Sequence, residues 1–340
     1  MNTSESKGNT DGRMRLTVLG GYLGSGKTTW LRHQLHQGVF KDAFVIVNEA
    51  AETPVDDALL QKSSKLAVLA GGCACCTGKA ELIACLRGLC DERSKHSSDQ
   101  THLQRIVLET SGLADPGPIV EAIRSDPILV HHIVVSEVLV TVDALHALAQ
   151  LHSEPLGRQQ IEIADCFMIT KLDEANSTDL QKLLATLKFM NPVATMLGSI
   201  KGSAAPLPGF DNVEPEVLAP ITEDADQSPI FPARIVIDNT IDWAAFSVWL
   251  SALLHARGDN VVRVKGVVRT PAGRLLVQSV RKIVQSPEVL PEQDDRPDRE
   301  DNVIVVIGRG YAAEALTKSL RYFAGVSNQV NSTVTQKTDK

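Results

Sequence analysis

The chain has 340 residues and a formal net charge of −7 at pH 7, with 43% hydrophobic and 22% charged residues. This length allows two domains, each with its own core, and the composition is that of a globular protein rather than a disordered one. The acidic balance disfavours nucleic acid or an anionic membrane as a partner, because such binders carry a basic face that neutralises phosphates. No apolar run approaches the roughly 18 residues of a membrane-spanning helix, and the polar leader has no hydrophobic export signal, so we expect a cytoplasmic protein.

The first half of the chain has the pattern of an α/β domain. After a leader over residues 1–13 that we expect to be disordered, apolar runs alternate with stretches of helical periodicity as far as residue 197. Strands that alternate with helices predict a mostly parallel sheet flanked by helices. This α/β domain is therefore assigned to residues 14–197. Its predicted strands are 15–19, 43–48, 66–70, 105–109, 134–143 and 164–170, with a helix over 27–37.

The second half predicts a smaller unit. Residues 198–230 are rich in Pro, Gly, Ser and acidic residues, which is typical of a linker. Residues 231–325 predict a C-terminal α+β domain, and residues 326–340 a flexible tail. Within this unit the segment 286–302 is acidic and reads as a solvated loop, with a partner contact as the alternative. The predicted elements are strands at 234–237, 261–268, 274–280 and 303–307 and helices at 243–254 and 311–323.

A phosphate-binding motif follows the first predicted strand and precedes the first predicted helix. The sequence Gly21-Tyr-Leu-Gly-Ser-Gly-Lys-Thr28 matches the P-loop pattern in the context that the mechanism requires. Glycines let backbone N–H groups turn toward the phosphates, and the helix N-terminus favours an anion. We expect Lys27 to reach the β- and γ-phosphates and Thr28 to bind Mg²⁺; the alternative is a glycine-rich turn without a ligand. The predicted nucleotide-binding residues here are Gly21, Gly24, Ser25, Gly26, Lys27, Thr28 and Thr29.

A second phosphate-site segment ends a later strand. Glu109 follows the apolar run 106–108 and supplies the acidic group that a P-loop enzyme places near Mg²⁺. Gly112 then offers its backbone N–H to the γ-phosphate, so that the loop 110–115 would sense this phosphate. The predicted catalytic residues are Lys27, Glu109 and Gly112. An exposed carboxylate at a strand end is the alternative for Glu109.

A third segment predicts the site that reads the base. Thr170, Lys171 and Asp173 follow a buried strand. The Asp173 carboxylate can accept hydrogen bonds from both N1–H and the exocyclic amine of guanine, and the aliphatic stem of Lys171 can pack over the base. Adenine offers no such donor pair, so the motif favours GTP, although four residues alone are a weak signal.

Three cysteines crowd between the two phosphate-site segments. Cys73, Cys75 and Cys76 follow a predicted strand and precede a helix, whose N-terminus lowers thiol pKa values. Three sulfurs favour an ion such as Zn²⁺ with a fourth ligand from elsewhere, and Glu49 is the candidate for that ligand or for one near it. A redox pair or small buried side chains in a tight turn are the alternatives. The remaining cysteines, predicted to be core residues, are Cys85, Cys90 and Cys166.

Taken together, these motifs resemble the CobW-like family of metal-handling P-loop GTPases, relatives of the urease and hydrogenase nickel-insertion GTPases. The resemblance spans about residues 14–325, including a CobW-type C-terminal domain. The segments that carry it are Gly20–Thr29, Asn48–Glu49 running on to Asp56–Asp57, Cys73–Cys76, Glu109–Pro116, Asn191–Ala194, Arg263–Gly266 and Val306–Arg309.

The resemblance implies GTP hydrolysis coupled to binding of a transition metal, Zn²⁺ or Co²⁺, and its delivery to a client metalloprotein. It makes the Cys-x-Cys-Cys element the metal site and residues 49–57 the first nucleotide-sensing loop, and by analogy it allows a nucleotide-dependent homodimer. Two features depart from the family. Thr170 stands where the base motif usually begins with Asn, and the nine histidines are scattered, which argues against high-capacity metal storage.

Two other functions stay open on the sequence. One is a nucleotide-dependent activator or assembly scaffold for a metalloenzyme that carries no metal itself, which would tolerate loss of the three cysteines. The other is a small-molecule kinase, because P-loop folds also phosphorylate metabolites. The kinase would need a substrate pocket and a product other than inorganic phosphate.

Overall fold

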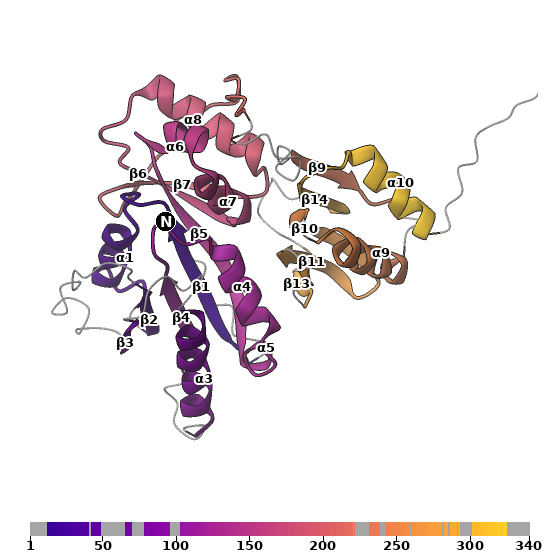
Figure 1. Ribbon diagram of the computed structural model, residues 1–340, viewed down its shortest axis with the longest axis horizontal. Coiled ribbons are helices and arrows are strands. Elements are labelled where there is room, and N and C mark those ends of the chain that lie inside the picture. Colours follow the sequence, from indigo (N-terminus) through magenta and orange to yellow (C-terminus); the bar gives the residue numbers. More distant parts are fainter. Residues whose placement is uncertain are drawn as a thin grey trace, which may run out of the picture.

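The protein consists of two units that lie side by side, each built on its own sheet (Figure 1). This arrangement is taken from a computed structural model. None of the helices in the described part of the chain is long and apolar enough to cross a membrane. The residues that the structure describes are 12–40, 42–48, 65–69, 78–95, 103–219, 221, 231–238, 242–258, 260–280, 282–284, 286–290, 292 and 301–324.

The first unit is built on a sheet with the strand order β3-β2-β4-β1-β5-β6-β7-β8. All of its neighbouring strands pair in parallel except β7 and β8, which are antiparallel. The central strand β1 lies between β4 and β5, so the segments that follow these three strands meet at one edge of the sheet. The strands are β1 (Met14–Gly21), β2 (Ala43–Asn48), β3 (Lys65–Leu69), β4 (Arg105–Glu109), β5 (Ile133–Asp143), β6 (Cys166–Thr170), β7 (Thr195–Ile200) and β8 (Ser203–Ala205).

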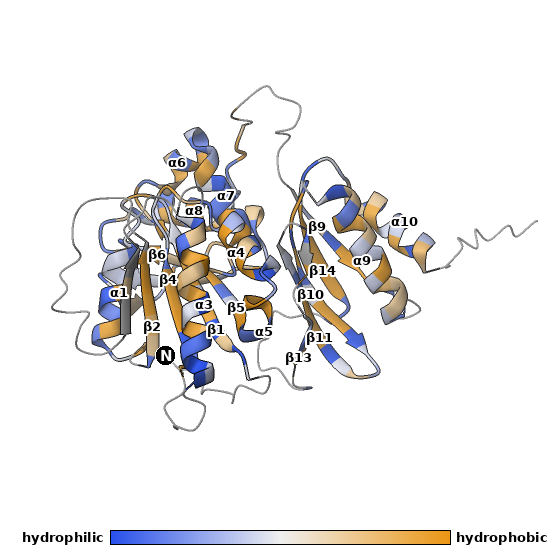
Figure 2. Ribbon diagram, turned by 60° about the horizontal axis from the view of Figure 1, so that its bottom comes forward, coloured by the Kyte–Doolittle hydropathy of each residue, from blue (hydrophilic) through white to orange (hydrophobic). Residues whose placement is uncertain are grey.

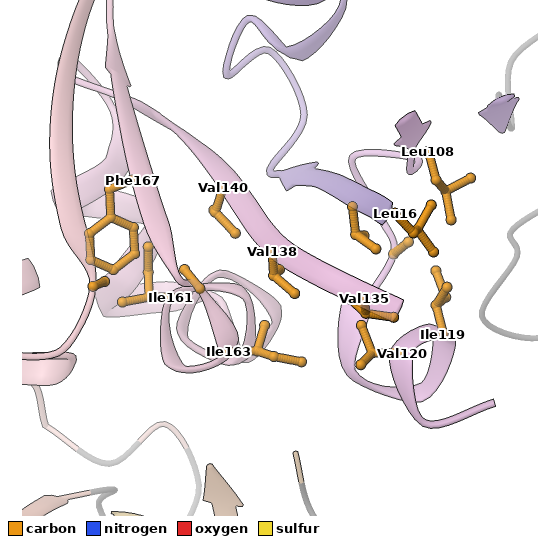
Figure 3. Packing of buried hydrophobic residues seen from close by; sticks show 14 of the residues in the cluster. Leu16, Leu108, Ile119, Val120, Val135, Val138, Val140, Ile161, Ile163 and Phe167 are labelled. Atoms are coloured by element: carbon orange, nitrogen blue, oxygen red, sulfur yellow. The ribbon is translucent and has the colours of Figure 1, made fainter. Parts of the chain in front are cut away.

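Helices cover both faces of this sheet, which explains why its strands are apolar runs. One core, shown in Figure 3, lies between the sheet and the layer of α3, α4, α7 and α8 and includes Leu108, Val138 and Phe167. On the opposite face, Trp30 and Leu31 of α1 pack in a second core. The predicted α/β fold is thus confirmed. The helices are α1 (Lys27–His36), α3 (Lys79–Lys95), α4 (Pro116–Ser125), α5 (Leu129–His132), α6 (Ala147–Ser153), α7 (Pro155–Ile163) and α8 (Ser177–Met190).

The first sheet continues to Ala205, beyond residue 197 where the sequence analysis placed the end of the domain. Side chains of the first unit then hold part of the predicted linker. Glu216 pairs with His152 at 2.7 Å and with Lys182 at 2.8 Å, and Arg158 donates to the Ala219 carbonyl at 2.8 Å. A composition rich in Pro, Gly and Ser therefore accompanies a segment that lies on the first unit.

The second unit is an antiparallel sheet with the order β12-β11-β10-β14-β9, and β13 also pairs with β11. The sequence analysis predicts a loop over 286–302, but Glu288–Leu290 form β13 because their backbone groups pair with β11. The elements are β9 (Phe231–Val236), β10 (Val261–Thr270), β11 (Gly273–Val280), β12 (Ile283–Val284), β13 (Glu288–Leu290), β14 (Val303–Gly308), α9 (Trp243–Arg257) and α10 (Ala313–Phe323).

Both faces of the second sheet are covered. Val264, Val268 and Val306 belong to a core with α9 and α10. Figure 2 shows α9 and α10 on the side of the second sheet that faces away from the first unit. Alternate residues of β10 point the other way, because side chains in a strand alternate between the two faces. There Arg263 is 2% exposed and Lys265 contacts Asp165 of the first unit. The sheet is therefore enclosed between its own helices and the first unit.

Candidate functional site

The P-loop between β1 and α1 has backbone angles that require glycine. Gly21, Gly24 and Gly26 have φ values of 135°, 74° and 86°, a region that other residues rarely adopt. Gly26 also caps α1 without a side-chain hydrogen bond. Backbone N–H groups at this helix N-terminus are thus available to an anion. These glycines occupy the places that the sequence motif predicts.

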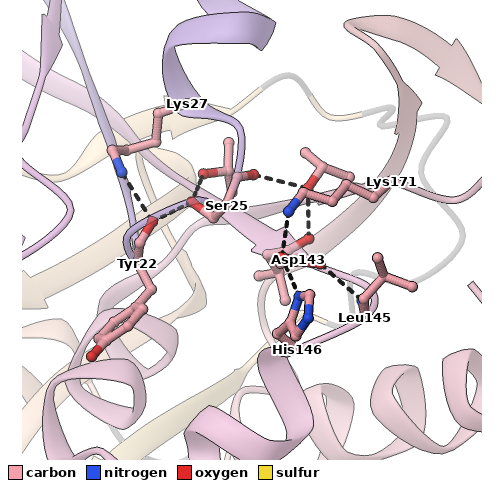
Figure 4. Close-up of polar contacts among 10 residues, drawn as sticks. Tyr22, Ser25, Lys27, Asp143, Leu145, His146 and Lys171 are labelled. Carbon is pink, nitrogen blue, oxygen red and sulfur yellow. Dashed lines mark hydrogen bonds and ion pairs between the residues drawn. The ribbon is translucent and has the colours of Figure 1, made fainter. Parts of the chain in front are cut away.

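Residues near the carboxyl ends of β5 and β6 form hydrogen bonds with this loop. Ser25 Oγ lies 2.6 Å from Thr141 Oγ1 and donates to the Tyr22 carbonyl at 2.7 Å (Figure 4). A Cβ atom on Gly21 would come within 2.3 Å of Thr141 Oγ1, so the packing also demands glycine there. Thr170, which is 7% exposed, donates to the Ser25 carbonyl at 2.8 Å. These contacts hold the P-loop in shape.

Lys27 is buried in the loop. Its Nζ donates to the carbonyl oxygens of Gly21 at 2.9 Å and Tyr22 at 3.0 Å, and the residue is 8% exposed. Burial lowers the pKa of Lys27 from its usual 10.5 to about 8, although the Glu109 carboxylate opposes this by raising it. The ammonium group thus lies where the phosphates are expected, and its charge is sensitive to alkaline pH.

We expect the affinity for GTP to fall as pH rises through about 8, the pKa of Lys27. Below this pH the ammonium is charged and can attract phosphate, whereas above it the neutral amine cannot. The decline should approach about tenfold per pH unit, the limit for loss of one proton. The measurement is the Kd of a fluorescent GTP analogue from pH 7 to pH 9. A Lys27→Arg variant keeps its charge and should give a flatter profile; equal slopes in both proteins would contradict the assignment.

Thr28 and Glu109 form a pair that fits a magnesium ion. Thr28 Oγ1 donates to Glu109 Oε1 at 2.5 Å, and Glu109 is 4% exposed. The two residues come from α1 and β4, which adjoins β1. Mg²⁺ prefers oxygen ligands and takes one or two protein groups together with nucleotide phosphates. Hydroxyl and carboxylate oxygens at this place are such a set. Thr29 is exposed on the first turn of α1.

The loop after β4 lies against the P-loop. A Cβ atom on Gly112 would come within 2.8 Å of the Leu23 backbone, so glycine permits this close approach. Asp115 then caps α4 by accepting from Gly117 N–H at 2.8 Å. The loop 110–115 therefore lies beside the P-loop and leads directly into α4.

The predicted base motif follows β6. Lys171 has a left-handed φ of 58°, and its Nζ donates to Asp143 Oδ2 at 2.6 Å. Asp173 is exposed in the turn that follows. The residues of the predicted base motif therefore have different surroundings: Thr170 contacts the P-loop, whereas Asp173 is exposed to solvent.

Asp143 is a site residue that sequence reasoning missed. It ends β5, is 3% exposed, and also accepts from His146 Nδ1 at 3.0 Å and from Leu145 N–H at 2.9 Å. Burial raises the pKa of its carboxyl, but hydrogen bonds from Lys171, His146 and Leu145 outweigh burial, so the pKa lies below its usual value. The group is ionised at neutral pH and fixes Lys171. Asp143 lies opposite Thr170 because of the register in which β5 and β6 pair, and this register cannot be read from a sequence motif.

An Asp143→Asn substitution should weaken GTP binding about tenfold, because it removes the negative charge that pairs with Lys171 and hydrogen bonds to charged groups contribute about 1.5–3 kcal/mol. Titration with a fluorescent GTP analogue measures the effect. Glu216→Gln is the matched control, because Glu216 also binds one Lys and one His but at 24% side-chain exposure and away from this site. Equal affinities for the Asp143 variant and wild type would show that Lys171 needs no such support.

The predicted thiolate ligands Cys73, Cys75 and Cys76, and Glu49, lie outside the described residues. Among the residues that are described, no three His, Cys, Asp or Glu side chains could hold a metal ion. In the sequence the cysteines follow β3, and β3 is parallel to β2, β4 and β1, so its carboxyl end lies at the same edge of the sheet as the end of β1. Burial raises the pKa values of the other thiols, most strongly for Cys90, to about 11, and Cys166, to about 12, as expected for core residues.

The fold and this site define a P-loop nucleoside triphosphatase domain joined to a second, antiparallel unit. Residues 15–198 match the family model described as CobW/HypB/UreG, nucleotide-binding domain, and residues 233–324 match the cobalamin synthesis protein cobW C-terminal domain. The chain belongs to the CobW/HypB/UreG family, as the motifs indicate.

Relatives cover most of the chain. Zinc chaperone YjiA of Escherichia coli is 32% identical over 292 residues, which is 83% of this chain and 91% of that protein. Zinc chaperone CobW of Pseudomonas aeruginosa is 28% identical over 315 residues, covering 79% and 81%. A Zn(II)-bound triple mutant of YjiA GTPase has a similar structure, with a TM-score of 0.63, 27% identity and coverage of 92% and 99%.

Proposed function

We propose that this chain is a GTPase that binds Zn²⁺ through Cys73, Cys75 and Cys76 and delivers it to a client metalloprotein. The observation that supports this most is the arrangement of the first sheet, in which the strand leading into the cysteines and the strands leading into both phosphate-site loops share one edge. Zinc chaperone relatives that align with most of the chain support the same function. Co²⁺ is the alternative cargo.

In this proposal the P-loop backbone and Lys27 hold the phosphates, and Asp173 selects guanine. Thr28 and Glu109 would hold Mg²⁺, which when bound neutralises charge on the phosphates. Gly112 would offer its N–H to the γ-phosphate, so the loop 110–115 changes its preferred position when that phosphate leaves. Glu49 would be a further zinc ligand. Thiolate ligands need a reducing compartment, which fits a cytoplasmic location.

Coupling between zinc and GTP follows from this shared edge. Filling one site changes the preferred arrangement of loops that the other site also uses, so each ligand alters the affinity for the other by the same factor. A nucleotide-dependent homodimer would add a second means of coupling, and the client would be a metalloprotein whose zinc site is empty before transfer.

The test measures GTP and ATP turnover with Mg²⁺ while Zn²⁺ or Co²⁺ is titrated into wild type and a Cys75→Ala, Cys76→Ala double variant. Cys85→Ala is the matched control, because Cys85 lies on α3 with a raised pKa. GTP-selective turnover that changes with metal, and loses that response only in the double variant, supports the proposal. Turnover that is indifferent to metal and to these cysteines would favour the metal-free scaffold. ATP turnover equal to that of GTP would remove the guanine assignment.

A further inference from the structure

One buried amide connects α7 to the loop beside the expected γ-phosphate. Gln160 is 1% exposed, and its Nε2 donates to the Ala114 carbonyl at 2.8 Å. Within the loop, Ala114 N–H donates to the Ser111 carbonyl at 3.0 Å. A buried amide hydrogen bond fixes both partners, because breaking it leaves polar groups without water. The position of Gln160 therefore affects the position of the loop.

The C-terminal turn of the same helix is held by the second unit. Arg263 of β10 donates one guanidinium nitrogen to the Ile163 carbonyl and another to Asp165 Oδ1, and Lys265 reaches the same oxygen at 2.8 Å. Ile163 lies three residues after Gln160, within one turn of α7. Arg263 thus acts as a cap on the C-terminal turn of α7, supplied by a different unit of the chain.

A second helix links the same two places. Asp115, where the loop ends, is the N-cap of α4, and Arg124 in the last turn of α4 interacts electrostatically with Asp165 and Arg263. Burial, with the like charge of Arg263, lowers the pKa of Arg124 to about 10, while Asp165 raises it. Gly117 of α4 also packs near Ile163, since a Cβ on Gly117 would lie 3.5 Å from Ile163 Cδ1. The two helices and the second unit meet in one packed cluster.

We propose that Gln160 is a positioning residue for the loop 110–115 and that the second unit, through Arg263, sets the position of Gln160 by way of α7. The inference rests on the proposed GTPase function, since its readout is the γ-phosphate. A packed helix moves as a rigid body, so a change at the Arg263 contact displaces Gln160 as well. A metal or client that shifts the second unit would then change the rate of GTP hydrolysis without touching the nucleotide.

The experiment uses the full chain with two single variants and their double variant. Gln160→Met removes the amide but keeps the length of the side chain. Arg263→Lys keeps the positive charge but loses the two guanidinium nitrogens that donate to Ile163 and Asp165. Measured quantities are kcat and KM for GTP, and the affinities for GDP and for a non-hydrolysable GTP analogue. Gln181→Met and Arg269→Lys are matched controls. In wild type Gln181 donates to the Gly209 carbonyl, and Arg269 of the second unit donates to the carboxylates of Asp301 and Glu292, away from α7 and from the loop.

Gln160→Met should lower kcat about fivefold, the effect of one lost hydrogen bond, with the GDP affinity unchanged. Arg263→Lys should lower kcat about threefold, and the double variant no further than Gln160→Met alone, because both act through α7. Lys265→Met replaces Arg263→Lys if the latter does not fold.

An unchanged kcat in Gln160→Met, or equal losses of affinity for GDP and the GTP analogue, would overturn the positioning role. Effects that multiply in the double variant would overturn the link to the second unit. If wild type hydrolyses no GTP, the proposed function fails. The ratio of analogue affinity to GDP affinity would then judge the positioning role by itself.

Discussion

A Lys27→Ala substitution lowers kcat/KM for GTP by about 10²–10³-fold, the effect of removing one preorganised group that stabilises transition-state charge. Lys27 Nζ donates to two carbonyl oxygens of the P-loop within 3.0 Å, so its charge is fixed at this loop. Steady-state kinetics with Mg²⁺ measures the loss. A value within tenfold of wild type would contradict the role of Lys27.

Two comparisons separate this loss from misfolding. Lys188→Ala removes a lysine on α8 that also donates to a backbone carbonyl, that of Pro192 at 2.9 Å, and should leave kinetics unchanged. In addition, folding lowers the pKa of Lys27, so the nucleotide-free protein gains stability from this group as pH rises from about 8 toward 10.5 and carries its full penalty below pH 8. Removing the ammonium should not lower the melting temperature at neutral pH. A large decrease would show that Lys27 has a structural role.

A Gly112→Ala substitution should lower kcat by about 10²-fold, since displacing a catalytic group by about 1 Å has effects of this size. The new methyl group would meet the Leu23 backbone at 2.8 Å, and backbone cannot give way as a flexible side chain does. The loop must therefore move away from the γ-phosphate. Because GDP lacks that phosphate, the affinity for GDP should remain close to wild type.

Gly88→Ala is the control for this substitution. Gly88 lies on α3, and a Cβ there meets nothing within 4 Å. Alanine favours a helix over glycine by about 1 kcal/mol, so this variant should melt slightly higher with unchanged kcat. If Gly112→Ala retains full kcat, or weakens GDP as much as GTP, the loop does not contact the γ-phosphate.

The sequence indicates that the P-loop and Glu109 meet, because this arrangement follows from local rules. A P-loop must follow a strand, and the carboxyl ends of parallel strands meet at one edge, so Thr28 and Glu109 could be expected together. In the structure Thr28 Oγ1 lies 2.5 Å from Glu109 Oε1. Asp143 could not be foreseen, because its contact with Lys171 depends on a strand register that residue patterns leave open.

The contacts of α7 were missed for a different reason. Gln160 is a single polar residue on a short helix, and Arg263 and Lys265 alternate with valines in β10. Alternation of polar and apolar residues usually indicates a strand with one face in water. The partners of Arg263 lie about 100 residues earlier in the chain, so only the packing of the two units reveals that this face is buried.

Enclosure of the second sheet on both faces has a consequence for how the chain unfolds. Beside Arg263 and Lys265, the face toward the first unit carries the buried side chains of Val267, Leu276 and Ile307, and Ile307 is the register partner of Arg263. If the units separated, water would reach these apolar side chains and the charged cluster of Arg263, Lys265 and Asp165. The two units should therefore melt cooperatively, and a truncation at their junction would leave each half with an exposed, aggregation-prone surface.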